Sequence, residues 1–177
     1  FACLPVAQYG AAVETVEYDS FSALLDAFYD ARERQERVRQ RGADLLRAAS
    51  LLLFCFPGSP TVYYGDEAGM EGFEDPFNRQ PYPWGREDRE LIDWFRALGL
   101  LRRERTALRR GSIRYVYAKG PLLAFLREAG EERLLCVFNA GKEFKTLELE
   151  LELDETLTLL LGWAGIQCSE TGVSLTI

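Results

Sequence analysis

The sequence predicts an α/β region followed by a small all-β domain, and three observations support this. Up to about residue 110, apolar residues recur at helical spacing around one short strand-like segment. After Gly111 the apolar period changes to two, most regularly from Thr146 to Leu153, where leucines alternate with glutamates. A length of 177 residues and a hydrophobic content of 47% are enough for both parts. We expect the parts to be residues 1–111 and 112–177.

Two helices are expected before residue 57. Asp19 and Ser20 precede an apolar series with helical spacing and offer an N-cap. Gly42 interrupts the charged stretch that follows, and Asp44 is expected to cap a second helix. Pro57, with the glycine after it, ends that second helix.

A strand, a long loop and another helix complete the first part. The segment Thr61–Tyr64 is β-branched and aromatic, which predicts a short strand. The next helix is expected from about Arg86 to Leu108, with Gly111 as its C-cap. In a (β/α)8 barrel, which needs about 250 residues, such a loop follows a strand at the face that carries the active site. The sequence therefore contains at most the last quarter or so of a barrel.

The second part contains only strand patterns, and short antiparallel strands at this spacing are typical of a small β-sandwich. The expected strands are Ile113–Ala118, Leu122–Arg127, Leu134–Phe138, Thr146–Leu153, Leu157–Leu161 and Val173–Ile177.

Composition excludes several classes of function. A net charge of −7 and a pI near 4.8 argue against a nucleic-acid partner and an anionic membrane surface. The apolar run Leu51–Phe56 is too short to span a bilayer. The absence of histidine excludes Ser-His-Asp and Cys-His nucleophiles within these residues. The four cysteines include no CxxC pair, which argues against a metal or redox motif. Cys55 and Cys136 lie in apolar runs and are expected to be buried. We therefore expect a reduced, cytoplasmic protein.

The most informative segment is Pro57–Trp84, which reads PGSPTVYYGDEAGMEG and continues FEDPFNRQPYPW. A rigid strand that leads into a long loop is a common way to build a ligand site. This loop combines carboxylates, one arginine and several aromatic rings. Such a combination suits a neutral ligand that is rich in hydroxyl groups, such as a sugar.

These same residues resemble the end of the barrel in glycoside hydrolase family 13, the alpha-amylase family. DPFNRQPYPW is most similar to the neopullulanase, maltogenic amylase and cyclomaltodextrinase branch. The resemblance implies the C-terminal portion of a (β/α)8 TIM barrel followed by a β-sandwich. It also implies a parent glycosidase that hydrolyses or transfers α-glucosidic bonds of starch-derived α-glucans or maltodextrins with retention.

The resemblance also implies that the catalytic carboxylates lie outside this sequence. The family supplies the nucleophile and the acid from strands four and five, which would precede Phe1. Its third carboxylate follows a histidine, and this sequence has none. Asp66 and Glu67 are adjacent and would leave a strand on opposite faces, which disfavours them as a catalytic pair. Since both ends look cut, we expect a fragment that binds substrate but has no catalytic residue.

Four residues are the candidates for contacting an α-glucan or maltooligosaccharide: Asp75, Arg79, Glu67 and Trp84. By resemblance, Asp75 and Arg79 contact a glucose unit through charge-assisted hydrogen bonds; the alternative is a salt bridge that folds the loop. Glu67 either orders the loop or forms a wall of the site. Trp84 either stacks on a sugar or fixes the loop to the barrel.

The same residues also allow other functions. No cofactor is expected, although the loop carboxylates offer oxygen ligands for Ca²⁺. Tyr63 and Tyr64 are expected to pack in a core rather than face a pocket. The β domain either stabilises the barrel or binds glucan through Tyr115, Tyr117 and Trp163. The alternative to a glycosidase part is a non-catalytic carbohydrate-binding or structural module.

Overall fold

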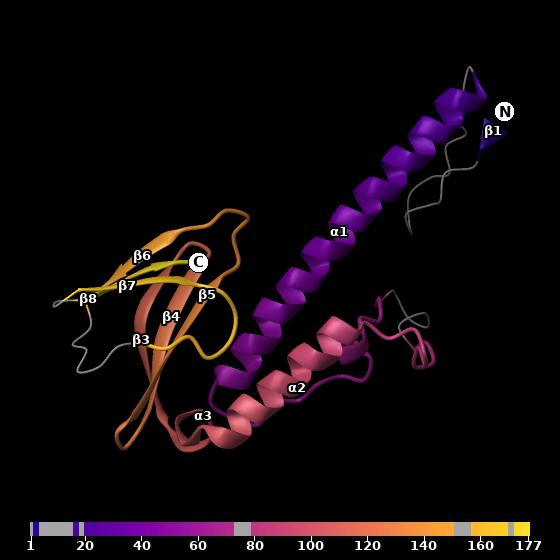
Figure 1. The fold of residues 1–177 in the computed structure, drawn as a ribbon. Helices are drawn as coiled ribbons and strands as arrows, with labels where there is room; N and C mark the ends of the chain where they lie inside the picture. The colour runs from indigo at the N-terminus through magenta and orange to yellow at the C-terminus, as the bar shows by residue number, and fades with distance from the viewer. Residues whose placement is uncertain (1, 4–15, 18–19, 73–78, 151–156, 170–171) are drawn as a thin grey trace. The chain divides into compact units, whose positions relative to one another are not determined.

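The computed structural model describes residues 2–3, 16–17, 20–72, 79–150, 157–169 and 172–177 (Figure 1). The chain divides into two compact units, residues 1–42 and 43–177. Across the described residues, no helix combines the length and apolar character needed to cross a membrane.

The first unit contains a short strand pair and the start of helix α1 (Phe21–Cys55). Strands β1 (Ala2–Cys3) and β2 (Val16–Glu17) pair antiparallel. The backbone N–H of Ala23 donates to Ser20 Oγ at 3.1 Å, so Ser20 caps the helix as the sequence predicted.

Helix α1 continues without a break to Cys55, so the prediction of two helices separated at Gly42 was wrong. One glycine in a helix costs only about 1 kcal/mol relative to alanine, and the residues around it form helices well. Asp44, expected as a cap, lies within the helix and pairs with Arg47 at 3.4 Å.

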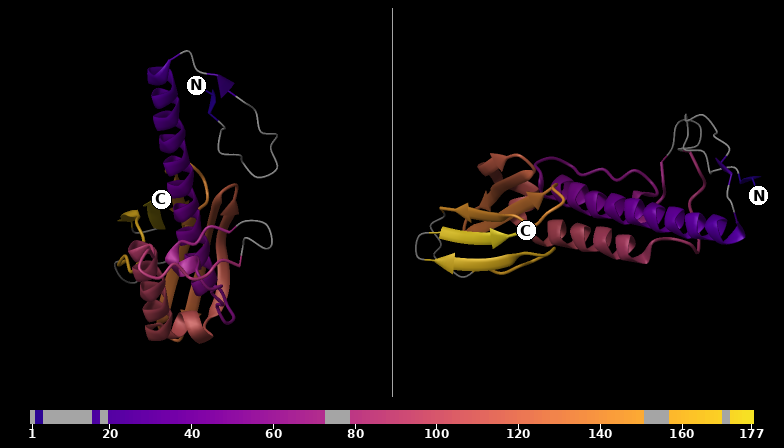
Figure 2. Two further views of the ribbon diagram at one scale, coloured as in Figure 1. Left: turned by 90° about the vertical axis from the view of Figure 1, so that its right-hand side faces the viewer. Right: turned by 90° about the horizontal axis from the view of Figure 1, so that it is seen from above.

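Helix α2 (Arg89–Glu104) runs alongside the last turns of α1, as the views in Figure 2 show. The indole N–H of Trp94 donates to Ser50 Oγ at 3.0 Å. The rings of Phe54 and Phe95 meet edge to face with centroids 6.4 Å apart. These contacts hold α2 against α1 within the second unit.

The helix predicted over 86–108 is two helices in the structure. Arg105 adopts an extended conformation and separates α2 from the short helix α3 (Thr106–Arg110). Gly111 follows α3, and its N–H donates to Ala107 O at 2.9 Å. Its φ of −70° is not left-handed, but a Cβ would lie 2.4 Å from Ala107 O and 2.7 Å from Glu128 O. Glycine is therefore required here by close backbone approach.

After Gly111, the described residues form two three-stranded antiparallel sheets. The first is a meander in the order β3-β4-β5, and the second has the order β6-β8-β7. The bounds are β3 Ser112–Lys119, β4 Leu122–Ala129, β5 Glu132–Asn139, β6 Thr146–Leu149, β7 Gly165–Ser169 and β8 Gly172–Thr176.

Two apolar clusters lie on opposite faces of the β3-β4-β5 sheet. One lies between the sheets and contains Leu122, Ala124, Leu147, Leu149, Val173 and Leu175. The other packs the sheet against the end of α1 and against α3, and contains Cys55, Leu108, Phe125, Cys136 and Phe138. Strands β4 and β5 are thus buried on both faces, which explains why their sequences are continuous apolar runs.

Two segments predicted as strands are irregular. Thr61–Tyr64 pairs with no described strand, and Val62, Tyr63 and Tyr64 are exposed. A strand needs hydrogen-bonded neighbours, whatever its β-propensity. Leu157–Leu161 is also irregular. Strand β7 was missed because its sequence, GIQCS, has little apolar character and is mostly exposed.

Candidate functional site

The loop Pro57–Trp84 leaves the end of α1 and returns to α2, and residues 73–78 within it lie outside the described part of the chain. The Tyr64 hydroxyl donates to Gln80 O at 2.9 Å, which ties the first arm of the loop to the second. The exposed fractions of Tyr63 and Tyr64 are 61% and 44%, so the expectation that they pack in a core was wrong. With no neighbouring strand to cover this segment in the described structure, the rings remain at the surface.

Gly65 forms the first sharp turn of the loop. Its φ is +95°, which a residue with a side chain rarely adopts, and a Cβ would lie 2.3 Å from Met70 Sδ. Gly65 O accepts the N–H of Ala68 and of Met70, each at 3.0 Å. The short helix η1 (Asp66–Ala68) therefore begins at this glycine.

Glu67 orders the loop through two hydrogen bonds. Its Oε2 accepts the backbone N–H of Gly65 at 3.0 Å. Its carboxylate also hydrogen-bonds the side chain of Tyr82, in the second arm. The structure thus shows the contacts expected of a loop-ordering residue, while contact with a sugar stays a prediction.

These contacts shift the pKa values of nearby groups. Burial, followed by the charge and hydrogen bond of Glu67, raises the pKa of Tyr82 above its usual value. Burial also raises the pKa of Asp66, and the charge of Glu67 adds to the shift. Backbone N–H groups of Glu87 and Gly85 lower the pKa of Glu87. The tyrosine therefore stays a protonated hydrogen-bond donor and Glu87 a carboxylate near neutral pH.

Asp88 connects the loop to α2, a role that sequence reasoning missed. Its carboxylate accepts the N–H of Leu91 at 3.1 Å, and its own N–H donates to Ala68 O at 3.0 Å. Gly69 has a φ of +71°, and a Cβ there would lie 3.1 Å from the Asp88 side chain, so a residue with a side chain would be strained at this position. The available signal was an aspartate directly before the apolar pattern of α2.

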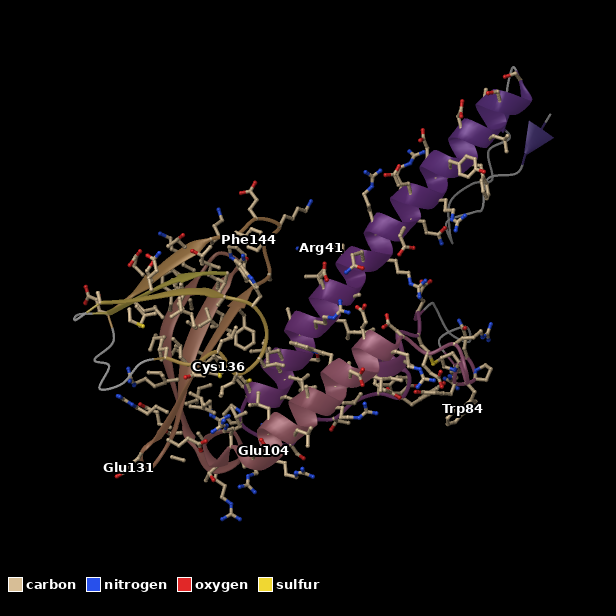
Figure 3. The ribbon with its side chains drawn as sticks, viewed as in Figure 1. Arg41, Trp84, Glu104, Glu131, Cys136 and Phe144 are labelled. Carbon is tan, nitrogen blue, oxygen red and sulfur yellow. The ribbon has the colours of Figure 1, made fainter. Side chains whose placement is uncertain are left out.

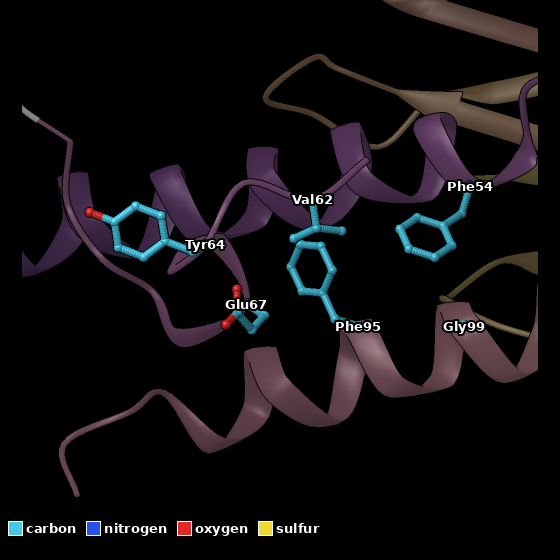
Figure 4. Close-up of a pocket in the computed structure, with 6 residues that line it drawn as sticks. All are labelled: Phe54, Val62, Tyr64, Glu67, Phe95 and Gly99. Carbon is cyan, nitrogen blue, oxygen red and sulfur yellow. The ribbon is translucent and has the colours of Figure 1, made fainter. Parts of the chain in front are cut away.

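An apolar cleft lies between the loop and the two helices (Figure 4). Its volume is about 410 Å³, and it is lined by Phe54, Val62, Tyr64, Glu67, Phe95 and Gly99. Glu67 is the carboxylate in a lining that is otherwise aliphatic and aromatic. The cleft offers apolar surface with a single carboxylate rather than the paired carboxylates of a glycosidase centre.

The four predicted ligand residues do not all meet in this cleft. Glu67 lines it, whereas the exposed Arg79 and Trp84 belong to the second arm of the loop and are not among its lining residues. The side chain of Trp84 is 81% exposed, and its ring lies 4.6 Å from that of Tyr82, centroid to centroid. Asp75 lies outside the described residues. An exposed indole supported from one side by Tyr82 is suited to stack on a planar or sugar ligand.

A second cavity, of about 650 Å³, lies between α2 and the β domain. It is lined by Arg47, Glu90, Asp93, Trp94, Ala97, Leu161, Gly162 and Trp163. Of the other stacking candidates, Tyr115 is 56% exposed, whereas Tyr117 packs against the core between the sheets. Within the described residues, no three His, Cys, Asp or Glu side chains converge on a possible metal site.

Several curated proteins match parts of this chain. Amylopullulanase from Thermoanaerobacter thermohydrosulfuricus is 38% identical over 98 residues, which cover 55% of this chain and 7% of that protein. Intracellular maltogenic amylase from Bacillus subtilis is 31% identical over 148 residues, covering 79% of this chain and 24% of that protein. No protein-family model matches the chain.

Solved structures agree with these matches. The debranching enzyme from Nostoc punctiforme superimposes with a TM-score of 0.68 at 35% identity, covering 75% of this chain and 28% of that structure. The alpha-amylase from Geobacillus thermoleovorans, solved in complex with acarbose, gives a TM-score of 0.66 at 31% identity over 75% of this chain and 30% of that one.

The chain spans less than a third of each of these relatives. The matching proteins also include cyclomaltodextrinases and a neopullulanase, the enzymes whose loop the segment Pro57–Trp84 resembles. The comparisons thus confirm the predicted resemblance and identify this chain as a relative of the C-terminal part of glycoside hydrolase family 13, the alpha-amylase family.

Proposed function

We propose that this chain is the C-terminal part of a retaining glycosidase that acts on α-glucans or maltodextrins, and that its loop Pro57–Trp84 contributes to substrate binding. One observation carries the proposal: the family-like loop motif lies in a chain whose relatives are an amylopullulanase, cyclomaltodextrinases and a maltogenic amylase. The ring of Trp84, at the end of this loop, is exposed and accessible to a ligand.

The proposal assigns the last turns of α1, the segment Thr61–Tyr64 and α2 to the end of a (β/α)8 barrel. The apolar cleft of about 410 Å³ beside Val62 and Phe95 supports this assignment. Exposed Val62, Tyr63 and Tyr64 are the side chains expected to be covered when neighbouring barrel strands are present. The β-sandwich then serves as the domain that packs against the end of the barrel.

In this proposal the chain supplies no catalytic residue. Retention requires two carboxyl groups about 5–5.5 Å apart across the scissile bond. Glu67 is held by Gly65 and Tyr82, and its neighbour Asp66 has a raised pKa caused mainly by burial. The hydrogen bond from Gly65 to Glu67 supports a role for this carboxylate in ordering the loop. The nucleophile and acid would come from other parts of the parent enzyme, and no cofactor is required.

Sugar recognition is assigned to the second arm of the loop. Trp84 would stack on a glucose ring, while Asp75 and Arg79 would hydrogen-bond its hydroxyl groups. Glu67 would hold the first arm in place through Tyr82.

The buried thiols of Cys55 and Cys136 suit a reducing compartment, so a cytoplasmic location belongs to the same proposal.

The test measures binding and cleavage separately with the purified 177-residue chain. Maltoheptaose is titrated while tryptophan fluorescence is recorded, and released reducing ends are measured over a long incubation. We expect weak binding, at least tenfold weaker in Trp84→Ala and Arg79→Ala, and no cleavage. Trp163→Ala, which removes an exposed indole from the β domain, is the matched control and should bind normally.

Two outcomes would contradict parts of this proposal. Cleavage of maltoheptaose by the purified chain would refute the assignment of catalysis to other residues. Binding that survives Trp84→Ala and Arg79→Ala would refute the assignment of recognition to the second arm of the loop.

A second candidate function is a non-catalytic carbohydrate-binding module. The cavity of about 650 Å³ favours it, because Trp94, Trp163 and the charged pair Arg47 and Glu90 line one space. Arg47 and Glu90 are 3.1 Å apart there. Maltoheptaose binding that is lost in Trp163→Ala and retained in Trp84→Ala would select this candidate over the loop.

A further inference from the structure

The side chain of Tyr64 connects the two arms of the loop Pro57–Trp84 through its hydroxyl group. The hydroxyl donates to Gln80 O at 2.9 Å, so a side chain of the first arm holds the backbone of the second arm. Figure 4 shows the ring of Tyr64 at the apolar cleft, with its hydroxyl directed away from Val62 and Phe95. The ring therefore lines the cleft, whereas the hydroxyl bonds to the second arm.

The acceptor of this bond lies at the start of a stiff segment that ends at Trp84. Pro81 and Pro83 each fix φ at about −65°, and each restricts the residue before it to extended conformations. The N–H of Trp84 donates to Tyr82 O at 2.9 Å, at the end of this segment. A bond that fixes the carbonyl group of Gln80 therefore also restricts where the backbone of Trp84 can lie.

The indole of Trp84 depends on this segment for its place at the surface. The side chain is largely exposed, and its ring stacks against Tyr82 with centroids 4.6 Å apart. Figure 3 labels Trp84 beside the start of α2. Because the ring is so exposed, the position of its own backbone largely determines where it can meet a ligand.

Tyr63, the residue before Tyr64, allows a comparison within the same segment. Its ring is also exposed and lies 4.9 Å from the Tyr64 ring, centroid to centroid. Its carbonyl oxygen accepts the N–H of Asp66 at 3.2 Å, but within the described part of the chain its hydroxyl makes no hydrogen bond. The two tyrosines thus differ in what the hydroxyl group contacts.

We propose that Tyr64 is a positioning residue for glucan binding: its hydroxyl fixes Gln80 and, through the two prolines, presents the Trp84 ring to a sugar. This inference rests on the proposed function, in which Trp84 stacks on a glucose ring. Tyr64 itself touches no sugar in this arrangement. It acts by restricting the second arm before the ligand arrives, so that less conformational freedom is lost on binding.

Removing single oxygen atoms separates this role from packing. Tyr64→Phe keeps the ring at the cleft and deletes the hydrogen bond to Gln80 O, whereas Tyr63→Phe deletes the neighbouring hydroxyl and is the matched control. Maltoheptaose binding is measured by NMR titration, which does not rely on tryptophan fluorescence. We expect Tyr64→Phe to bind about three- to tenfold more weakly than the parent, the range that one ordinary hydrogen bond gives. Tyr63→Phe should bind as the parent does.

A role that acts through Trp84 also predicts how two substitutions combine. In a Trp84→Ala chain, adding Tyr64→Phe should weaken binding no further, because the ring that the hydroxyl positions is already absent. Equal weakening by Tyr64→Phe in the parent and in the Trp84→Ala chain would overturn the proposal. Parent-like binding by Tyr64→Phe would also overturn it, as would an equal loss of binding in Tyr63→Phe.

The carbonyl resonance of Gln80 tests the hydrogen bond without a ligand. Labelling glutamine at the carbonyl carbon and proline at nitrogen selects this residue, because Gln80–Pro81 is the single Gln-Pro pair in the sequence. The resonance should move upfield in Tyr64→Phe, which removes the donor, and stay in place in Tyr63→Phe.

The mobility of the Trp84 indole tests the effect on the ring. The heteronuclear NOE of its N–H group should fall in Tyr64→Phe as the ring gains motion. The indole of Trp94 is the internal reference, because it donates to Ser50 Oγ at 3.0 Å and should not change.

These signals distinguish failure of the positioning role from failure of the proposed function. A parent chain that binds no maltoheptaose would refute the assignment of sugar binding to the loop, and with it the role of Tyr64 in glucan binding. Unchanged Gln80 and Trp84 signals in Tyr64→Phe would refute the positioning role alone, whatever the parent chain binds.

Discussion

Arg127 donates a hydrogen bond to the carbonyl oxygen of Cys55 at 2.5 Å, across 72 positions of sequence. The side chain of this arginine is 1% exposed and also donates to Gly111 O and Ser112 O, at 2.8 and 3.1 Å. The last turn of α1 carries no basic residue of its own. A cation from β4 therefore satisfies a terminal carbonyl and opposes the negative end of the helix.

Arg102 completes the same arrangement from α2. It donates to Phe54 O at 2.5 Å and Phe56 O at 3.2 Å, and also to Gly58 O. Burial, with the charge of Arg127, lowers its pKa from the usual value. The start of the loop Pro57–Trp84 is thus fixed by guanidinium groups from two other elements, although none of these atoms belongs to the candidate site.

Replacing Arg127 by methionine should lower the free energy of unfolding by about 3 kcal/mol, because one buried and two partly buried carbonyl oxygens lose their donor. Urea denaturation followed by circular dichroism measures the change. Arg114→Met, on the neighbouring strand β3, is the matched control. Its side chain is 56% exposed and pairs with Glu128 at 3.5 Å, so its loss should change the free energy by less than about 0.5 kcal/mol. If the two substitutions lowered the free energy of unfolding equally, the hydrogen bonds of Arg127 would contribute no more to stability than the exposed ion pair of Arg114.

Replacing Gly65 by alanine should destabilise the first turn of the loop by about 1–3 kcal/mol, because φ is +95° and the Met70 side chain occupies the space of a Cβ. Hydrogen exchange of the Ala68 and Met70 amides, which both donate to Gly65 O, reports this local change. Gly72→Ala is the control, since nothing lies within 4 Å of its Cβ position. Unchanged exchange in Gly65→Ala would contradict the structure of this turn.

Replacing Glu67 by glutamine should lower the pKa of Tyr82 toward the ordinary tyrosine value. The negative charge and hydrogen bond of Glu67 raise that pKa, second only to burial, and a neutral amide removes the charge. NMR titration of tyrosine labelled at Cζ measures it. Glu87→Gln should give a smaller decrease, because the charge of Glu87 contributes less. An unchanged pKa in Glu67→Gln would mean that the carboxylate and the phenol do not interact.

Stability should increase on acidification through the titration of Asp66. Its folded pKa is raised, mainly by burial, so the folded state binds more protons than the unfolded state between the two pKa values. The free energy of unfolding contributed by this group therefore falls as pH rises through that interval and stays low above the folded pKa. Asp66→Asn should be more stable than the parent at pH 7 and should lose this part of the pH dependence.

Urea unfolding at several pH values between about 4 and 7 measures the effect of Asp66. Asp93→Asn, on the exposed surface of α2, is the control and should leave the pH profile nearly unchanged. A parent chain and an Asp66→Asn chain with parallel profiles would show that Asp66 does not titrate differently in the folded state.

The local sequence pattern predicted most of the β domain and the loop motif. It failed where secondary structure depends on residues that are distant in the sequence. Strands β3, β4 and β5 follow apolar runs closed by Gly120 and Gly130, whose φ values of +58° and +61° suit tight turns. The segment Thr61–Tyr64 has equally strong β-propensity and yet forms no strand, because pairing needs partners that the described residues do not provide.

The sequence by itself determined the family that the chain resembles, through the order of residues in Pro57–Trp84, and the alternation that builds the antiparallel sheets. These features depend on residues that lie close together in the chain, so they can be recognised from the sequence. Only the tertiary structure decided that α1 continues past Gly42, that Glu67 holds Gly65 and Tyr82, and that Arg127 meets Cys55. The hydrogen bond from Arg127 to Cys55 joins residues 72 positions apart, so its energy arises from the tertiary fold and cannot be inferred from local pattern.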